Sequence, residues 1–275
     1  MKIINITNKL VDCLLIKRGK VISQSFYEHL LQKSLAGLNI GQGGDLKQSG
    51  ELNCIKYVRD GIIPLKKNNI IIFDVGANEG EYAKALSGIF NNMNTKIFCF
   101  EPSPRIYEKL QKNCENIPSI IFNNIGFGNE PKKTTLYSND ERSGLSSLFN
   151  RKLDHFNLQL DKTEEVEIQT IDSYCRNNNI NEIDFLKIDV EGNEMNVLDG
   201  AQQMIKNQAV KYIQFEFGGC NIDSKTYFQD FYYFLTENNY KISRILQDGL
   251  HEIRKYRESN EIFLTTNYLA ELRVK

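Results

Sequence analysis

Short apolar runs recur along the chain from residue 70 onward, and amphipathic stretches separate them. The runs that predict buried strands are residues 70–75, 96–101, 119–124, 183–192, 210–217, 241–246 and 261–265. Between them, apolar side chains at helical spacing predict helices that begin near residues 81, 103, 197 and 227. Strands that alternate with helices in this order predict an open, doubly wound α/β sheet, mostly parallel and seven-stranded, with helices on both faces.

The first 69 residues have a different pattern. Apolar side chains fall at helical spacing at Phe26, Leu30, Leu31 and Leu35. A second helix is expected from about residue 51 to 58, after the glycine-rich stretch 37–50. We interpret that stretch as a connector, with a mobile lid over a site as the alternative. Residues 1–69 are therefore expected to form a helical extension that acts as a lid or contacts substrate or a second subunit.

Polar and apolar residues alternate between residues 134 and 171, as they do in strands with one exposed face. Two such strands are predicted at 135–137 and 165–169, and a polar stretch lies between them. We therefore expect one α/β domain over 70–275, with an insertion at about 130–165 near the ligand-binding edge of the sheet. Acceptor specificity is expected in this insertion and in residues 1–69.

The composition of the chain limits the kinds of partner that it is expected to bind. The chain has 275 residues, 41% of them hydrophobic, with 34 basic and 35 acidic side chains and a formal net charge of −1. A balanced charge provides no overall field that favours nucleic acid or an anionic membrane. We expect no nucleic-acid partner, and any charged partner must be recognised locally.

Six scattered cysteines contain no C-x-x-C pair and no spacing suited to zinc, which favours a reducing, cytoplasmic setting. The apolar patch at residues 11–16 is interrupted by Asp12, so it fits neither a signal peptide nor a transmembrane segment. Peripheral attachment of this basic, partly amphipathic segment to a membrane remains an alternative.

Acids stand at the carboxyl ends of four predicted strands: Asp74, Glu101, Asp189 and Glu216. In open α/β sheets, ligands bind beyond these strand ends. After Asp74 the chain passes through a turn bounded by Gly76 and Gly80, where the backbone can approach a ligand. Glu101 lies 21 residues beyond Gly80, the position from which a carboxylate binds both hydroxyls of an adenosine ribose.

Two adenosine cofactors compete for such a site. A nicotinamide dinucleotide calls for G-x-G-x-x-G, whereas the turn contains only Gly76 and Gly80, and no tyrosine has a lysine four positions later. S-adenosylmethionine has no phosphate and carries a cationic methionine moiety that Asp74 and Glu79 could help to hold. The acid-rich turn therefore favours S-adenosylmethionine.

Several motifs occur together in a fixed order. They are Phe73-Asp74-Val75-Gly76-Ala77-Asn78-Glu79-Gly80, Phe100-Glu101-Pro102, Asn124-Ile125-Gly126-Phe127-Gly128-Asn129, Ser146-Ser147-Leu148, Thr170-Ile171-Asp172-Ser173-Tyr174 and Leu186-Lys187-Ile188-Asp189-Val190-Glu191-Gly192-Asn193-Glu194. With them, residues 70 to about 268 resemble the FkbM-type S-adenosylmethionine-dependent methyltransferases. The last motif is the most specific of the set.

The resemblance implies a Rossmann-like class I methyltransferase fold and O-methylation of a hydroxyl on a sugar, glycan or secondary metabolite. The residues it places against S-adenosylmethionine are Asp74, Gly76, Ala77, Asn78, Glu101, Ser103, Asn124, Gly126 and Asp189. A homodimer is a further alternative for the N-terminal extension.

Methyl transfer from a sulfonium is an in-line displacement, so a base must take the hydroxyl proton as the new bond forms. Asp189 and Glu191 follow the fourth strand and Glu216 ends the fifth, so these three carboxylates are the candidate catalytic residues. In one interpretation Asp189 and Glu216 bind a divalent cation that activates the hydroxyl. In the other, Lys187 balances the acids and one carboxylate acts without metal.

Other candidates have ordinary explanations. His155 is a third potential base, although a lone histidine in a polar loop is usually only solvated. Ser146 and Ser147 either close over cofactor or substrate or belong to a surface turn. The aromatic residues between 227 and 234 have the spacing of a core helix rather than a sugar-stacking surface.

These patterns disfavour two other activities. Amino-group methylation of nucleic-acid bases typically uses an Asn/Asp-Pro-Pro-aromatic motif, and this chain has no Pro-Pro. A sugar-nucleotide glycosyltransferase would need an Asp-x-Asp pair, which is also missing. The rival from another class is a non-catalytic module that binds S-adenosylmethionine or a glycan.

Overall fold

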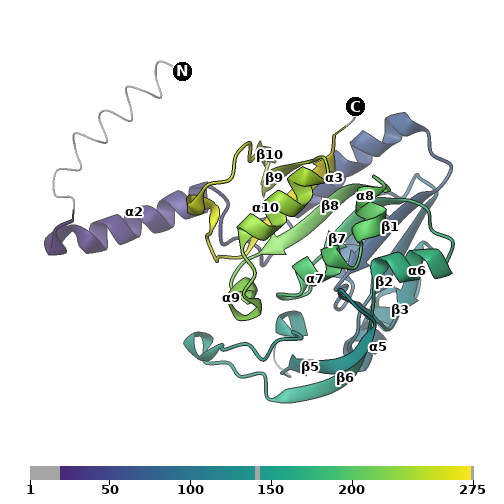
Figure 1. Ribbon diagram of the computed structural model, residues 1–275, viewed down its shortest axis with the longest axis horizontal. Coiled ribbons are helices and arrows are strands. Elements are labelled where there is room, and N and C mark those ends of the chain that lie inside the picture. Colours follow the sequence, from purple (N-terminus) through teal and green to yellow (C-terminus); the bar gives the residue numbers. More distant parts are fainter. Residues whose placement is uncertain (1–18, 140–142, 274–275) are drawn as a thin grey trace. The chain divides into compact units, whose positions relative to one another are not determined.

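The computed structural model of the protein describes residues 19–139 and 143–273 and contains two compact units, Met1–Ile40 and Gly41–Lys275 (Figure 1). In the first unit, the short helix η1 (Val21–Ser23) leads into α2 (Gln24–Gly37), which confirms the helix expected from the spacing of Phe26 and Leu30. The apolar patch at residues 11–16 lies outside the described residues.

An eight-stranded sheet forms the centre of the second unit, in the order β10-β9-β11-β8-β7-β1-β2-β3. Its strands are β1 (Ile70–Val75), β2 (Thr95–Phe100), β3 (Ile120–Asn123), β7 (Ile183–Ile188), β8 (Val210–Phe217), β9 (Tyr240–Leu246), β10 (Gly249–Glu252) and β11 (Thr266–Leu272). The five strands from β3 to β8 are parallel, and β11 runs antiparallel to both β8 and β9. The mostly parallel Rossmann-like sheet is confirmed, with one strand, β10, more than expected.

The strand predicted at 261–265 is wrong, because β11 begins only at Thr266. The apolar residues that led to this prediction pack against neighbouring side chains instead of pairing with another strand. The ring of Phe263 lies 5.2 Å from that of Phe217, and the N–H of Leu264 donates to the carbonyl of Ile262 at 2.8 Å in a tight turn. This segment covers the end of β8 before the chain enters the sheet.

Helices pack on both faces of the sheet, as expected from the alternation of elements. They are α3 (Glu51–Ile62), α4 (Glu81–Ile89), α5 (Pro104–Cys114), α6 (Ile171–Asn177), α7 (Glu194–Asp199), α8 (Gln202–Lys206), α9 (Cys220–Ser224) and α10 (Phe228–Glu237). Phe73 and Val75 of β1 point into a core shared with α6, α7, α8 and α10, whereas Ile70 and Ile72 point into a core shared with α3, α4 and α5. Figure 1 shows α8 and α10 in front of the sheet.

The second unit begins at Gly41, so α3, which was expected in the N-terminal extension, lies in the same unit as the sheet. Its buried residues Cys54, Ile55 and Val58 belong to one of the two cores of that sheet. A short helix, η2 (Ile63–Leu65), then leads to β1.

The insertion forms a second, smaller sheet in the order β4-β6-β5, built from β4 (Gly126–Phe127), β5 (Lys132–Ser138) and β6 (Lys162–Gln169). Leu136, Val166 and Ile168 form its apolar side. The alternating pattern therefore located both long strands. Two short helices, η3 (Ser143–Leu145) and η4 (Asp154–Phe156), lie in the polar stretch between them.

Five cysteines lie in the described part of the chain; all are buried and none forms a disulfide. Among the described helices, none combines the length and apolar character that a membrane crossing requires.

Candidate active site

The turn after β1 is held by backbone contacts that require glycine. The N–H groups of Gly76 and Ala77 both donate to the carbonyl of Phe100 at 3.0 Å. Gly76 has a φ of 79°, and a Cβ at this position would lie 1.8 Å from the carbonyl oxygen of Asp189. Gly80 also has a positive φ, 92°, and precedes α4. Glycine at position 76 therefore lets the turn lie directly against the end of β7.

Glu101, at the end of β2, holds the same turn from the other side. Its carboxylate accepts hydrogen bonds from the N–H groups of Asn78 at 3.1 Å and Ser103 at 2.9 Å. Burial raises the pKa of Glu101 to about 7, and these backbone donors act in the opposite direction. The amide of Asn124 donates to the carbonyls of Glu101 and Pro102 at 2.8 and 3.0 Å. Ser103 and Asn124 therefore shape the loop that presents Glu101.

A cavity opens at these strand ends, between the main sheet and the small sheet. Predicted cofactor residues that line it are Gly76, Asn78, Glu101, Gly126 and Asp189. Its other walls include Phe127, Leu136, Ser146, Leu148, Ile168 and Val190. The lining therefore combines apolar side chains with carboxylates, which suits a ligand with an aromatic base, a ribose and a charged tail.

Asp74 does not line this cavity, because it is fully buried behind the turn. The ammonium of Lys187 lies 3.4 Å from its carboxylate and 3.3 Å from that of Asp189, and it donates to the carbonyl of Gly76 at 3.2 Å. Burial works against the charge of Lys187, but Asp189 and Asp74 outweigh it and raise the lysine pKa. Burial also raises the pKa of Asp74, while Lys187 opposes the shift. Lys187 thus joins the ends of β1 and β7.

A second cavity adjoins the first and shares Gly76, Asn78 and Asp189 with it. Its remaining walls include Ala77, Glu79, Glu81 and Lys187, together with the loop from Gly43 to Leu46 and Glu51. Asp189 is the acid that lines both cavities. We call the first cavity the cofactor cavity, after the residues predicted to bind the cofactor, and this acid-lined space beside it is the candidate acceptor site.

The sequence patterns did not indicate Glu51, the first residue of α3, as a site residue. Its carboxylate accepts from the hydroxyl of Ser49 and the amide of Gln214, both at 2.8 Å. The hydroxyl of Tyr82 donates to Gln214 at 2.7 Å, and the ring of Tyr82 lies 5.1 Å from the ammonium of Lys187. Burial raises the pKa of Glu51 to about 7. Glu51 and Gln214 come from distant segments, so no local motif marks this network.

Arg151, in the insertion, was also not predicted. Its guanidinium pairs with the carboxylate of Glu191, and its Nε lies 3.6 Å from Asp223. The hydroxyl of Ser147 donates to the carbonyl of Glu191 at 2.6 Å. Burial and the nearby Asp189 raise the pKa of Glu191 to about 8, and Arg151 opposes the shift. The insertion is therefore fixed to the end of β7 at two points.

The third catalytic candidate, Glu216, is buried and has no hydrogen-bond or ion-pair partner within the described residues. Ligand atoms of Glu191, Glu216 and Cys220 lie within 4.8 Å of one another, and Asp189 is not part of this group. Burial and the neighbouring acids raise the pKa of Cys220, which keeps the thiol protonated. Magnesium and calcium take oxygen ligands, and Arg151 already neutralises Glu191, so these residues do not fit a hard divalent cation.

The remaining candidates from the sequence are Ser146, His155 and the aromatic residues of α10. Ser146 lines the cofactor cavity, and its buried hydroxyl has no hydrogen-bond partner in the part of the chain that the structure describes. His155 is exposed in η4 beside Phe156 and lines neither cavity. Phe228 and Phe231 are fully buried in the core, which confirms that α10 is a core helix.

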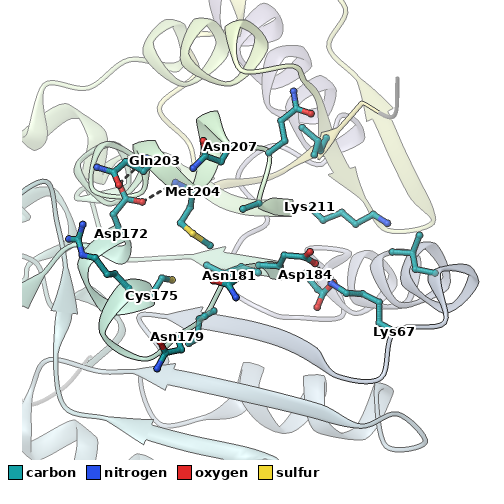
Figure 2. A pocket seen from close by; sticks show the side chains of 18 of the residues that line it. Lys67, Asp172, Cys175, Asn179, Asn181, Asp184, Gln203, Met204, Asn207 and Lys211 are labelled. Atoms are coloured by element: carbon teal, nitrogen blue, oxygen red, sulfur yellow. Dashed lines mark hydrogen bonds and ion pairs between the residues drawn. The ribbon is translucent and has the colours of Figure 1, made fainter.

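A larger cavity, of about 960 Å³, lies at the opposite edge of the sheet, where β7 and β8 begin (Figure 2). Its acids have partners from the protein. The ammonium of Lys67 lies 2.6 Å from both Glu182 and Asp184, and Asp172 accepts from two N–H groups of α8. None of the predicted site residues lines this cavity.

Comparison with known proteins identifies the family. Residues 74–242 match the methyltransferase FkbM domain family, and this range includes Asp74, Glu101 and the Lys187–Glu194 segment. The chain belongs to this family of S-adenosylmethionine-dependent methyltransferases. The resemblance inferred from the motifs is thereby confirmed.

Individual relatives are distant. The chain is 22% identical over 170 residues to the 2-O-methyltransferase NoeI of Sinorhizobium fredii, which covers 58% of this chain and 69% of the relative. It is 25% identical to Methyltransferase 1 of Beauveria bassiana over 50% of this chain and 61% of that one. The crystal structure of an FkbM methyltransferase from Methylobacillus flagellatus aligns with a TM-score of 0.45 at 17% identity, covering 74% of this chain and 44% of that one. Because these matches span only part of the relatives, the family assignment rests on the domain match.

Proposed function

We propose that the protein transfers the methyl group of S-adenosylmethionine to a hydroxyl oxygen of a sugar, a glycan or another small metabolite. The observation that carries the proposal is the position of Asp189, which lines both the cofactor cavity and the acid-lined cavity beside it. A carboxylate at this junction can take the proton of a hydroxyl presented from the second cavity. The relative named 2-O-methyltransferase NoeI supports a hydroxyl acceptor.

The residues at the strand ends fit S-adenosylmethionine. Glu101 would accept hydrogen bonds from the two ribose hydroxyls, as a strand-end carboxylate does in related adenosine sites. Phe127, Leu136 and Ile168 would pack against the adenine, and the turn at Gly76 would lie along the charged tail. When bound, the cofactor supplies an electrophilic methyl group on a cationic sulfur. The protein's own contribution is to align the hydroxyl and receive its proton.

Among the three candidate carboxylates, we assign the role of base to Asp189. Glu191 lines only the first of the two cavities, where it pairs with Arg151, and Glu216 lines neither. Lys187 lies 3.3 Å from Asp189 and fixes its carboxylate at the junction. Glu191 and Glu216 would then shape the electrostatic field of the site without contacting the hydroxyl.

The test is to incubate the protein with S-adenosylmethionine labelled in its methyl group and with cellular glycan and metabolite extracts, and to identify the methylated product. Asp189→Asn should lower turnover by about 10²–10⁴-fold while cofactor affinity, measured by calorimetry, changes little. Glu216→Gln is the matched control and should keep most of the activity. Loss of turnover in Glu216→Gln but not in Asp189→Asn would transfer the role of base to Glu216.

Two further outcomes address the alternatives. Activity that survives exhaustive chelation is expected here, and its loss would favour a metal-dependent O-methylation instead. Cofactor binding without labelled product from any extract would favour a non-catalytic binding module.

A further inference from the structure

Two residues that line the cofactor cavity each have a buried polar atom without a partner. The atoms are the hydroxyl oxygen of Ser146 and the side-chain amide oxygen of Asn78, and neither makes a hydrogen bond within residues 19–139 and 143–273. A buried polar group costs free energy until water or a ligand supplies the missing hydrogen bond. Two such atoms in one cavity therefore point to a polar ligand that completes them.

The pairing of the chain around Ser146 explains why its side chain faces the cavity. The N–H of Ser147 donates to the carbonyl of Tyr137 in β5 at 2.9 Å, and the N–H of Tyr137 donates to the carbonyl of Ser147 at 2.8 Å. Successive side chains of an extended, paired segment point in opposite directions. Ser146 and Leu148 both line the cavity, whereas the hydroxyl of Ser147 donates to the carbonyl of Glu191 at 2.6 Å. The alternation thus directs Ser146 into the cavity and Ser147 toward the end of β7.

Contacts on both sides of Ser146 place its hydroxyl beside the space proposed for the nucleoside. Leu148 packs against the apolar side of the small sheet, the wall proposed for the adenine. A Cβ on Gly144 would lie 3.7 Å from the amide nitrogen of Asn78, so the segment also reaches the turn after β1. The N–H of Asn78 in turn donates to Glu101, the residue proposed to bind the ribose. The nearest polar groups of a bound cofactor would therefore belong to its adenosine half.

We propose that the hydroxyl of Ser146 binds the adenosine half of S-adenosylmethionine, which makes the insertion part of the cofactor site. The inference rests on the position of the cofactor given under the proposed function. Adenosine has ring nitrogens that accept hydrogen bonds and amino and hydroxyl groups that donate them, and a serine hydroxyl can do either. The charged tail suits this place less well, because the wall beside Ser146 is apolar.

The test compares Ser146→Ala with Ser147→Ala, since the same change removes each of two neighbouring hydroxyls. Isothermal titration calorimetry is carried out with S-adenosylhomocysteine and with 5′-methylthioadenosine, which lacks the charged tail. No acceptor is needed for either measurement. Ser146→Ala should weaken the binding of both ligands by about three- to tenfold, the loss of one hydrogen bond. An equal factor for the two ligands places the contact on the nucleoside that they share.

Chemical denaturation of the cofactor-free protein separates the roles of the two hydroxyls. Ser146→Ala should leave the midpoint of denaturation unchanged or raise it, because the variant removes a buried hydroxyl that lacks a partner. Ser147→Ala should lower the midpoint, because the carbonyl of Glu191 and the N–H of Phe149 each lose a hydrogen bond. An equal fall of the midpoint in both variants would show that the hydroxyl of Ser146 serves the fold, and the proposal would be wrong.

Three affinity results would also overturn the proposal. Unchanged affinity in Ser146→Ala, together with weaker binding in Glu101→Gln, would remove Ser146 from a cofactor site whose position is right. Weaker binding of S-adenosylhomocysteine alone would place the hydroxyl against the charged tail instead of the nucleoside. Unchanged affinity in both Ser146→Ala and Glu101→Gln would show that the cofactor binds elsewhere, so the proposed position of the cofactor would fail together with this inference.

Discussion

The buried carboxylates at the two ends of the parallel strands differ in their partners. We call the end at which these strands begin the amino edge of the sheet and the end at which they finish the carboxyl edge. At the amino edge, Asp184 is almost fully buried but accepts from Lys67 at 2.6 Å and from the N–H of Ile71 at 2.9 Å. At the carboxyl edge, Glu101 has only backbone donors, and Glu216 has no partner within the described residues. Buried acids with complete partners stabilise a fold, whereas buried acids with incomplete partners are available to a ligand.

Cavity size alone would point to the end of the sheet opposite the proposed site. The cavity at the amino edge measures about 960 Å³, against about 100 Å³ for the cofactor cavity. The smaller cavity, however, contains strand-end and turn residues that the sequence motifs predicted for the cofactor, Gly76, Glu101 and Asp189. Under the proposed function, the cofactor lies in the smaller cavity, beside a carboxylate, Glu101, that is held by backbone N–H groups.

Among the variants that test the difference between the two edges, Glu101→Gln has the largest expected effect. Loss of the negative charge should weaken binding of S-adenosylmethionine by about 1.5–3 kcal/mol for each charge-assisted bond to the ribose. The amide retains the shape of the side chain, but one of the two backbone N–H groups, that of Asn78 or Ser103, would then face an amide N–H group. Chemical denaturation of the same variant separates a loss of stability from a loss of affinity. Isothermal titration calorimetry measures the effect, and an unchanged affinity would rule out contact between Glu101 and the ribose.

The matching change at the amino edge is Asp184→Asn. It should lower the free energy of unfolding by about 1–3 kcal/mol, because one of the donors, Lys67 or Ile71 N–H, would then face an amide N–H group. Affinity for the cofactor should stay the same. Chemical denaturation and calorimetry on the same sample check both statements, and a large loss of cofactor affinity would contradict the division between the two edges.

A change of pH should alter cofactor binding at the carboxyl edge through Glu101. Burial raises the pKa of Glu101 to about 7, and ribose hydroxyls favour its ionised form, so cofactor binding should release a proton. Affinity should therefore rise by about tenfold between about pH 6 and about pH 8, and Glu101→Gln should abolish this dependence. Calorimetry in buffers with different ionisation enthalpies detects the proton.

The raised pKa values of the buried glutamates also predict how the stability of the cofactor-free protein depends on pH. The pKa values of Glu51, Glu101 and Glu194 are raised from 4.5 to about 7. At a pH between these two pKa values, the folded state therefore binds more protons than the unfolded state. The free energy of unfolding should fall as pH rises through that window. A midpoint of denaturation that increases from about pH 5 to about pH 7 would contradict this sign.

The smallest expected effect belongs to Tyr82→Phe. It removes the hydroxyl that donates to Gln214 but keeps the ring beside Lys187. The loss of one neutral hydrogen bond should lower the free energy of unfolding by about 0.5–1.5 kcal/mol, with turnover nearly unchanged. A strong loss of turnover would instead show that the Glu51 network controls the position of Lys187 during catalysis.

The sequence predicted the elements whose pattern is local. Continuous apolar runs located the parallel strands, and Gly76 and Gly80 located the turn that follows β1. The role of that turn in binding the cofactor stays a prediction. The sequence misplaced β11, because Phe263 and its apolar neighbours pack over β8 without pairing. It missed Glu51 and Arg151, because each reaches the site through a contact with a residue far away in the chain. The roles of the catalytic carboxylates stay predictions.

The close contact between Gly76 and the carbonyl of Asp189 also bears on protein engineering. The cofactor turn and the segment that carries the proposed base touch through their main chains, so neither can be redesigned without moving the other. The insertion contacts the same segment through side chains that include Ser147 and Arg151. If the insertion sets acceptor specificity, as the sequence predicts, a grafted insertion that keeps these two residues should change the acceptor without moving the turn.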